Sequence, residues 1–72
     1  MKIYYDQEVD AAYFRLSEEL PTGVVEVSEG VNLDITEDGK IVGIEILNAS
    51  KSFPIQSLFT CEYEPKLMTG NA

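Results

Sequence analysis

The sequence of 72 residues has no histidine and a single cysteine, Cys61. An intrachain disulfide is therefore excluded, and a lone thiolate cannot assemble a zinc site. Without a histidine, Cys61 also lacks the neighbouring base that activates a nucleophilic thiol. Chains this short bury on the order of 60% of their unfolded surface, and small domains usually need additional support. We expect tight hairpin packing or self-association to supply it, and we favour a homodimer.

Basic residues are also scarce. Five Lys and Arg against thirteen Asp and Glu give a net charge of −8. Such a chain repels phosphate backbones and anionic headgroups, which argues against nucleic-acid or membrane binding and favours a basic protein partner or a cation. Residues 1–6 include no apolar run of signal-peptide length, and no segment approaches a transmembrane span. Together with one unpaired cysteine, these features predict a cytoplasmic protein.

The clearest pattern in the chain is an alternation of period two between residues 23 and 35. Its apolar members all fall on odd positions: Val25, Val27, Val31, Leu33 and Ile35. This spacing is typical of a half-buried strand. Asp38 and Gly39 follow, and this pair is a strong signal for a two-residue type I′ hairpin turn. Residues 40–47 then form a second run rich in β-branched residues.

The predicted turn sets a testable register. It places four pairs opposite one another: Glu37 with Lys40, Ile35 with Val42, Leu33 with Ile44, and Val31 with Ile46. Every pair is either apolar or oppositely charged, which is the matching that stabilises sheets. A three-residue loop would place Leu33 opposite Gly43, and we therefore predict the two-residue turn.

The two ends of the chain are less regular. Ile3 and Tyr5 indicate a short first strand, and residues 6–10 a polar turn. Residues 11–17 alternate as a strand would, but residues 9–20 also fit a helical stripe, so periodicity leaves both structures open. Near the other end, Ser52 is predicted to cap a short helix with Pro54 in its first turn. Residues 62–72 lack periodicity and are expected to fray.

These segments predict one domain of the α+β or mainly β class. Residues 1–52 would form an antiparallel sheet of about four strands built from β-hairpins, and residues 53–72 a short helix or irregular tail. One sheet face would be apolar, with these side chains: Ile3, Tyr5, Phe14, Leu16, Val25, Val27, Val31, Leu33, Ile35, Val42, Ile44 and Ile46. A short helix covers little of such a face, which favours face-to-face dimerisation or a partner.

Four segments together resemble a known family. They are residues 5–16 (YDQEVDAAYFRL), Gly30-Val31, Asp38-Gly39 and residues 42–50 (VGIEILNAS). Over residues 1 to about 52 the chain is similar to the small prokaryotic domain-of-unknown-function 2283 family. The resemblance implies that residues 11–17 form a strand. That family has no established function, but some members are thought to be encoded beside small toxin-like proteins, which implies an antitoxin role.

One motif suggests a metal site. Asp34, Thr36, Asp38 and Glu45 stand at the first, third, fifth and twelfth places of an EF-hand calcium loop, with Gly39 at the sixth. An EF-hand requires a helix on each side, whereas the preceding residues alternate as a strand. We therefore predict a β-hairpin with a polar turn, and keep a calcium-responsive domain as the alternative function.

The remaining polar and aromatic residues indicate binding rather than catalysis. Asp6, Asp10 and Glu45 are the candidates for acid–base chemistry, but no apolar pocket or basic neighbour is predicted that would shift their pKa values. We expect no enzyme and no cofactor. Tyrosine is enriched in protein contacts, and Asn32 lies opposite Glu45 on the predicted polar face. The candidates for protein binding are Tyr4, Tyr13, Asn32, Glu45, Phe53 and Phe59. The function predicted is that of an acidic, antitoxin-like module for a basic protein.

Overall fold

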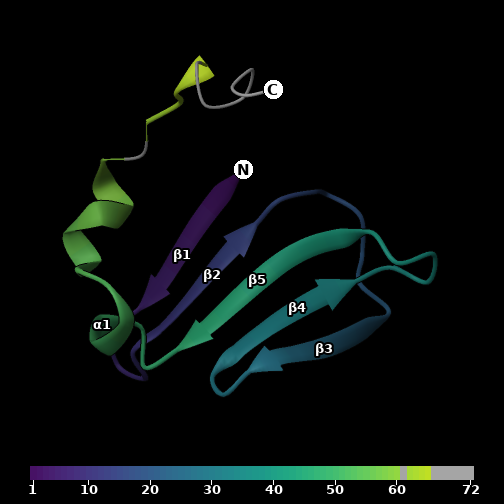
Figure 1. Ribbon diagram of the computed structural model, residues 1–72, viewed down its shortest axis with the longest axis horizontal. Coiled ribbons are helices and arrows are strands. Elements are labelled where there is room, and N and C mark those ends of the chain that lie inside the picture. Colours follow the sequence, from purple (N-terminus) through teal and green to yellow (C-terminus); the bar gives the residue numbers. More distant parts are fainter. Residues whose placement is uncertain (61, 66–72) are drawn as a thin grey trace.

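The computed structural model describes residues 1–60 and 62–65, which fold around one antiparallel sheet of five strands in the order β1-β2-β5-β4-β3 (Figure 1). The strands are β1 Lys2–Asp6, β2 Ala11–Arg15, β3 Gly23–Ser28, β4 Val31–Ile35 and β5 Ile41–Leu47. The mainly β class and the antiparallel hairpins are confirmed, and so is the strand that the family resemblance implied after residue 10. The sheet has one strand more than the predicted four.

The additional strand comes from residues 23–35, which form a hairpin rather than one strand. Gly30 has a φ of 80° and turns the chain between β3 and β4. A two-residue turn alone would move the apolar series from odd to even positions. A bulge at Val27, between the Glu26–Asn32 and Ser28–Val31 pairs, cancels that shift. The odd-numbered alternation therefore runs through the turn without a break.

The hairpin between β4 and β5 also differs from its prediction. Asp38 is not among the residues with positive φ, so the turn is not type I′. The loop has three residues, 37–39, because the Thr36 N–H donates to the Lys40 carbonyl at 2.8 Å and Gly39 takes a φ of 87°. Ile35 consequently pairs with Ile41, and the predicted pairs Glu37–Lys40 and Ile35–Val42 are wrong.

A second bulge restores the predicted register further along the same strands. The pairing shifts by one residue between Asp34, which faces Gly43, and Ile35, which faces Ile41. Val42 is the extra residue, and its side chain is only 2% exposed. Beyond it the predicted pairs Leu33–Ile44 and Val31–Ile46 are confirmed.

The register divides the sheet into two chemically different faces. On one face an apolar row crosses all five strands through Ile3, Phe14, Ile44, Leu33 and Val25. A second row beside it passes through Tyr5, Ala12, Ile46 and Val31. We call these nine residues the apolar face. Among the described residues, Ala12, Val42 and Ala49 are the only buried hydrophobic ones, so the interior is very small.

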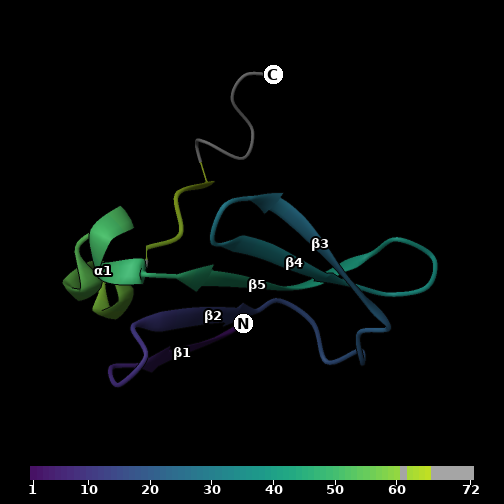
Figure 2. The same cartoon turned by 90° about the horizontal axis from the view of Figure 1, so that it is seen from below.

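Two short helical segments follow the sheet, at one end of it (Figure 2). The helix α1 spans Ala49–Ser52, and the 3-10 helix η1 spans Ile55–Phe59. Ser52 is therefore the last residue of α1 and not the predicted N-cap; η1 begins after Pro54, whose fixed φ suits that position. Neither segment forms a layer over the sheet.

The predicted fraying of residues 62–72 falls largely outside the described residues. In the described part of the chain, no helix has the length and apolar character needed to cross a membrane.

Candidate partner-binding face

The sheet face opposite the apolar face carries most of the predicted binding residues. Its central row joins Tyr4, Tyr13, Glu45, Asn32 and Glu26, in that order, across the five strands. The next row joins Lys2, Arg15, Gly43, Asp34 and Val24. We use the name tyrosine face for Tyr4, Tyr13, Asn32, Asp34 and Glu45. Four of the six predicted binding residues thus lie together on one row.

Tyr13 is fixed in place across the middle of this face. Its hydroxyl donates to Asp34 Oδ2 at 2.8 Å, so the side chain starts on β2, crosses the central strand β5 and ends on β4. The ring can do so because Gly43 has no side chain: a Cβ there would overlap the Tyr13 hydroxyl and ring. The hydrogen bond to the Asp34 carboxylate is the main reason why the pKa of Tyr13 lies above its ordinary value of 10.0.

The neighbouring side chains are also paired. Asn32 Nδ2 donates to Glu45 Oε1 at 3.2 Å, which confirms that these two residues face each other. The Tyr4 ring lies 6.3 Å from the Tyr13 ring at an angle of 49°, within the range of favourable aromatic pairs. Tyr4 is 42% exposed, whereas Tyr13, Asn32, Asp34 and Glu45 are half-buried. The face therefore presents an ordered surface of aromatic rings and carboxylates.

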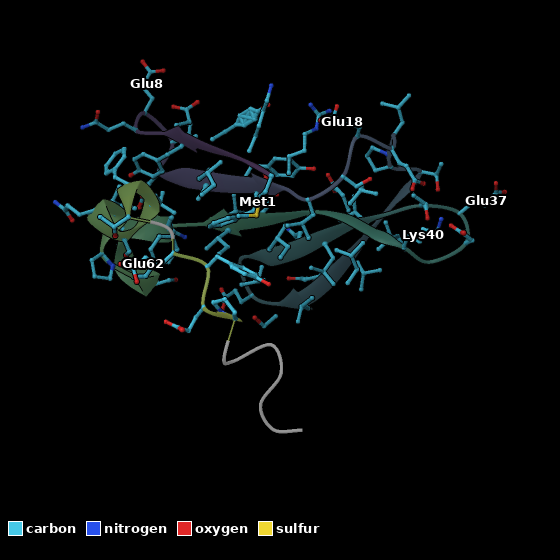
Figure 3. The ribbon with its side chains drawn as sticks, turned by 90° about the horizontal axis from the view of Figure 1, so that it is seen from above. Met1, Glu8, Glu18, Glu37, Lys40 and Glu62 are labelled. Carbon is cyan, nitrogen blue, oxygen red and sulfur yellow. The ribbon has the colours of Figure 1, made fainter. Side chains whose placement is uncertain are left out.

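The charges around the sheet are distributed unevenly. On the polar rows the two basic side chains, Lys2 and Arg15, belong to β1 and β2, and the acidic ones to β3, β4 and β5. Further acidic residues occupy the connections at both ends of the sheet; Glu8 and Glu37 mark these two ends in Figure 3. The apolar face carries no carboxylate and no amine. Apart from Glu62 and Glu64, which follow η1, the acidic residues therefore lie on the polar side of the sheet and in its connections.

Asp10, one of the candidates for acid–base chemistry, joins α1 to the turn between β1 and β2. Its Oδ1 accepts from the Tyr5 hydroxyl at 2.7 Å and from the Ser50 N–H at 3.0 Å, and its Oδ2 accepts from the Ser50 hydroxyl at 2.7 Å. Its carbonyl accepts from the Ala49 N–H at 2.9 Å. The bond from Tyr5, followed by that from Ser50, holds the pKa of Asp10 below its ordinary 3.8. This geometry fits a structural role.

Asp6, the second of these candidates, acts within the turn itself. Its Oδ1 accepts from the Glu8 N–H at 2.9 Å, which is the local pattern of a turn-forming aspartate. Glu45, the third, lies on the tyrosine face as described. The structure does not bring Asp6, Asp10 and Glu45 together: the two aspartates flank the first turn, and Glu45 is paired with Asn32.

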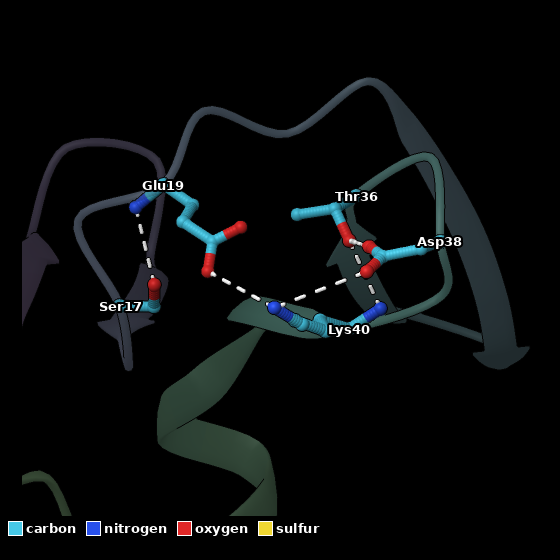
Figure 4. A network of polar contacts seen from close by, with 5 residues as sticks. All are labelled: Ser17, Glu19, Thr36, Asp38 and Lys40. Carbon is cyan, nitrogen blue, oxygen red and sulfur yellow. Dashed lines mark hydrogen bonds and ion pairs between the residues drawn. The ribbon is translucent and has the colours of Figure 1, made fainter.

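The predicted calcium ligands lie within a β-hairpin. The strands β4 and β5 flank residues 36–40, where an EF-hand would have helices. The Thr36 hydroxyl donates to Asp38 and accepts from the Lys40 N–H, and the Lys40 ammonium lies 3.8 Å from both Asp38 and Glu19 (Figure 4). Asp34 is bonded to Tyr13 instead. Residues 1–60 and 62–65 contain no group of three or more side chains of the metal-binding types placed to share one ion.

The last two binding candidates lie away from the tyrosine face. Phe53 follows α1 and is half-buried, and Phe59 ends η1 with 79% of its surface exposed. The sequence predicts Asp34 as a candidate metal ligand and places it on the polar face of the hairpin. Its bond to Tyr13 was missed because the partners are 21 residues apart. Gly43 within a β-branched run was the available signal, since glycine inside a strand often marks a close approach.

Comparison with known proteins gives one match. A family model described as a protein of unknown function, DUF2283, matches residues 2–50. This segment contains all five strands and the Asp10–Ser50 connection. Neither the curated proteins nor the solved structures include a significant match.

Proposed function

This chain belongs to the DUF2283 family of proteins of unknown function, and we propose that it is an acidic protein-binding module whose tyrosine face docks on a basic protein. The observation that carries the proposal is the fixed position of Tyr13, laid across Gly43 and bonded to Asp34. A side chain that is already ordered loses little conformational entropy on binding, which favours its use as an interface anchor.

The chemistry of the face favours guanidinium groups. Arginine stacks on tyrosine rings and forms paired hydrogen bonds with carboxylates. Asp34 uses Oδ2 and Glu45 uses Oε1 in their bonds to Tyr13 and Asn32, and these two bonds do not involve the second oxygen of either carboxylate. The exposed ring of Tyr4 packs on the Tyr13 ring, which lies between it and these carboxylates. An arginine-bearing surface would therefore meet rings and acids within two adjacent rows.

The net charge supports the same class of partner over a longer range. A charge of −8 attracts a basic protein before contact and raises the rate of association, an effect that salt weakens. Nucleic-acid-binding proteins such as toxin nucleases carry basic surfaces of this kind. The antitoxin role that the family resemblance implies is one specific case of this proposal.

The first test is identification of the partner, followed by binding of the purified pair. The tagged protein is used to retain proteins from its native host at low and moderate salt, and the retained proteins are identified by mass spectrometry. Binding of the purified candidate is then measured by calorimetry for the wild type, Glu45→Gln and Tyr4→Ala. We expect each substitution to raise Kd by about 10-fold or more, as loss of an interface anchor does.

Two matched variants control for charge and for aromatic surface. Glu37→Gln removes the same charge from the β4–β5 loop, and Tyr63→Ala removes a tyrosine that is 75% exposed outside the sheet. Both should bind within about twofold of the wild type, because distant exposed groups contribute little. Equal losses for all four variants would exclude the tyrosine face as the binding site. Failure to retain any basic protein at low salt would reject the proposed function.

A further inference from the structure

No helix or strand of the described residues forms a layer over the apolar face. One of its rows runs across all five strands and the other across four. Both helical segments lie at one end of the sheet, where they cover neither face (Figures 2 and 3). Ala12 is the one member of the apolar face that is fully buried, seven members are half-buried, and Val25 on the edge strand β3 is 44% exposed. A sheet gains most of its stability by packing one face against a second layer. The described residues provide no such layer.

We propose that the apolar face is covered by the same face of a second copy, so that the protein is a homodimer of two face-to-face sheets. The two sheets would form a sandwich with a shared core about 10 Å thick, their strands within about 30° of parallel. A face that packs on its own copy is self-complementary about a twofold axis. This proposal does not depend on the proposed partner, because the tyrosine faces point outwards from such a dimer.

The size of the face agrees with a stable dimer. Five strands of five to seven residues span roughly 24 Å by 19 Å, which is about 450 Å² in projection at the usual strand spacings. The corrugated surface of the side chains is larger than this projection. It is of the same order as the ~800 Å² that each partner buries in a typical stable interface.

The composition of the apolar face favours a second copy of this chain over a basic protein. A basic protein would lose the hydration of its cations against rows that contain no carboxylate. Pairing through the edge strands β1 and β3 would extend the sheet but leave both apolar rows in water. A second copy supplies equal area, equal width and no charge.

The test is the mass of the protein in solution, measured by sedimentation equilibrium from about 1 µM to about 500 µM. We expect a dimer of the 8.0 kDa chain. Val25→Glu places a carboxylate on the apolar face and should raise the dimer Kd by about 100-fold or more, because each copy then buries an unpaired charge against an apolar surface. Val24→Glu is the matched control. It changes the adjacent residue on the opposite face, is 65% exposed, and should leave the dimer intact.

Circular dichroism establishes whether each variant is folded. A second measurement covers the case in which Val25→Glu does not fold: isotope-filtered NOEs on a mixed labelled and unlabelled wild-type sample. Contacts between the methyl groups of Ile44, Leu33 and Val31 across the two copies support the face-to-face dimer. A folded wild type that stays monomeric at all concentrations overturns the proposal. So does a dimer lost in Val24→Glu alone, or one whose intermolecular NOEs join the backbones of β1 or β3.

Discussion

At the scale of single residues, the polar side of the sheet depends on Gly43, which leaves space for the Tyr13 ring. Glycine in a strand weakens the sheet by roughly 0.5–1 kcal/mol relative to alanine, so its presence requires a reason. At Gly43 the reason is the Tyr13 side chain, which occupies the volume a Cβ would need and reaches Asp34 beyond it. Gly43, Tyr13 and Asp34 therefore act as one unit.

This unit predicts that Gly43→Ala has opposite effects in two backgrounds. In the wild type the new methyl group displaces Tyr13 and breaks its bond to Asp34, so we expect the free energy of unfolding to fall by about 1–2 kcal/mol. In a Tyr13→Ala background the space is free, and the same substitution should be neutral or stabilising by about 0.5 kcal/mol. Urea unfolding of the four proteins measures the coupling. Equal effects in both backgrounds would show that Tyr13 does not occupy this position.

Asp10 also acts through its hydrogen bonds, and they give it a pH dependence of known sign. The bonds from Tyr5 and Ser50 lower the pKa of Asp10 in the folded state below the ordinary 3.8. The unfolded chain therefore takes up this proton first as the pH falls. The contribution of Asp10 to stability is complete above about pH 4 and is lost progressively below it, as the pH approaches the lower folded-state pKa.

The corresponding prediction compares Asp10→Asn with the wild type at about pH 3 and about pH 7. Asparagine tolerates the positive φ of 55° at this position but does not titrate. We expect Asp10→Asn to be less stable than the wild type at neutral pH, and the difference to shrink in acid, measured by urea unfolding at both values. Glu8→Gln, in the same turn, is the control for loss of one negative charge. A difference that stays constant with pH would show that the Asp10 carboxylate has no lowered pKa.

At the scale of secondary-structure elements, local pattern was sufficient for the strands but not for the connections between them. The alternation placed Ile3 and Tyr5 correctly on β1, and the central pairs of the β4–β5 hairpin are as predicted. The turn between β3 and β4 was missed, because the bulge at Val27 preserves the odd-numbered series. A three-residue loop contradicts the predicted central pairs unless a bulge compensates for the extra loop residue, and the bulge at Val42 does so. Two compensating irregularities cannot be read from periodicity alone.

The three-residue loop between β4 and β5 can be tested through Gly39. Gly39 has a φ of 87° and open space around its Cα, so Gly39→Ala encounters only the backbone penalty of the left-handed region. We expect a loss of roughly 1–2 kcal/mol in the free energy of unfolding. Gly39→Asn should lose clearly less, since asparagine visits this region readily. The measurement is thermal or urea unfolding of both variants. An Asn variant as unstable as the Ala variant would contradict a purely conformational cause.

The candidate site was predictable to a similar extent. The hairpin register correctly placed Asn32 opposite Glu45, and tyrosine chemistry singled out Tyr4 and Tyr13. What unites these residues is the pairing of β2 with β5, which joins segments about thirty positions apart. No local signal specifies that pairing. The row through Tyr13 and Glu45, and the bond from Tyr13 to Asp34, therefore became visible only in the folded sheet.

At the scale of the whole molecule, we propose different roles for the two faces of one sheet. The uncharged apolar face suits a second copy, and the tyrosine face suits an arginine-bearing protein. In the face-to-face dimer the two tyrosine faces lie on opposite outer surfaces, so each dimer would present two binding sites. The proposed arrangement would be compatible with the thin core, the net charge of −8 and the polar aromatic row.

This arrangement predicts that salt acts on the two interfaces in opposite directions. Each chain carries −8, so the two copies of a dimer repel each other, and raising sodium chloride from about 50 mM to about 500 mM screens that repulsion. We expect the dimer Kd to fall, while the Kd of the complex with a basic protein rises by about 10-fold or more because screening weakens its attraction. Sedimentation equilibrium follows the dimer, and calorimetry follows the complex over the same series. A dimer that dissociates as salt increases would be held by ion pairs, which the apolar face does not contain.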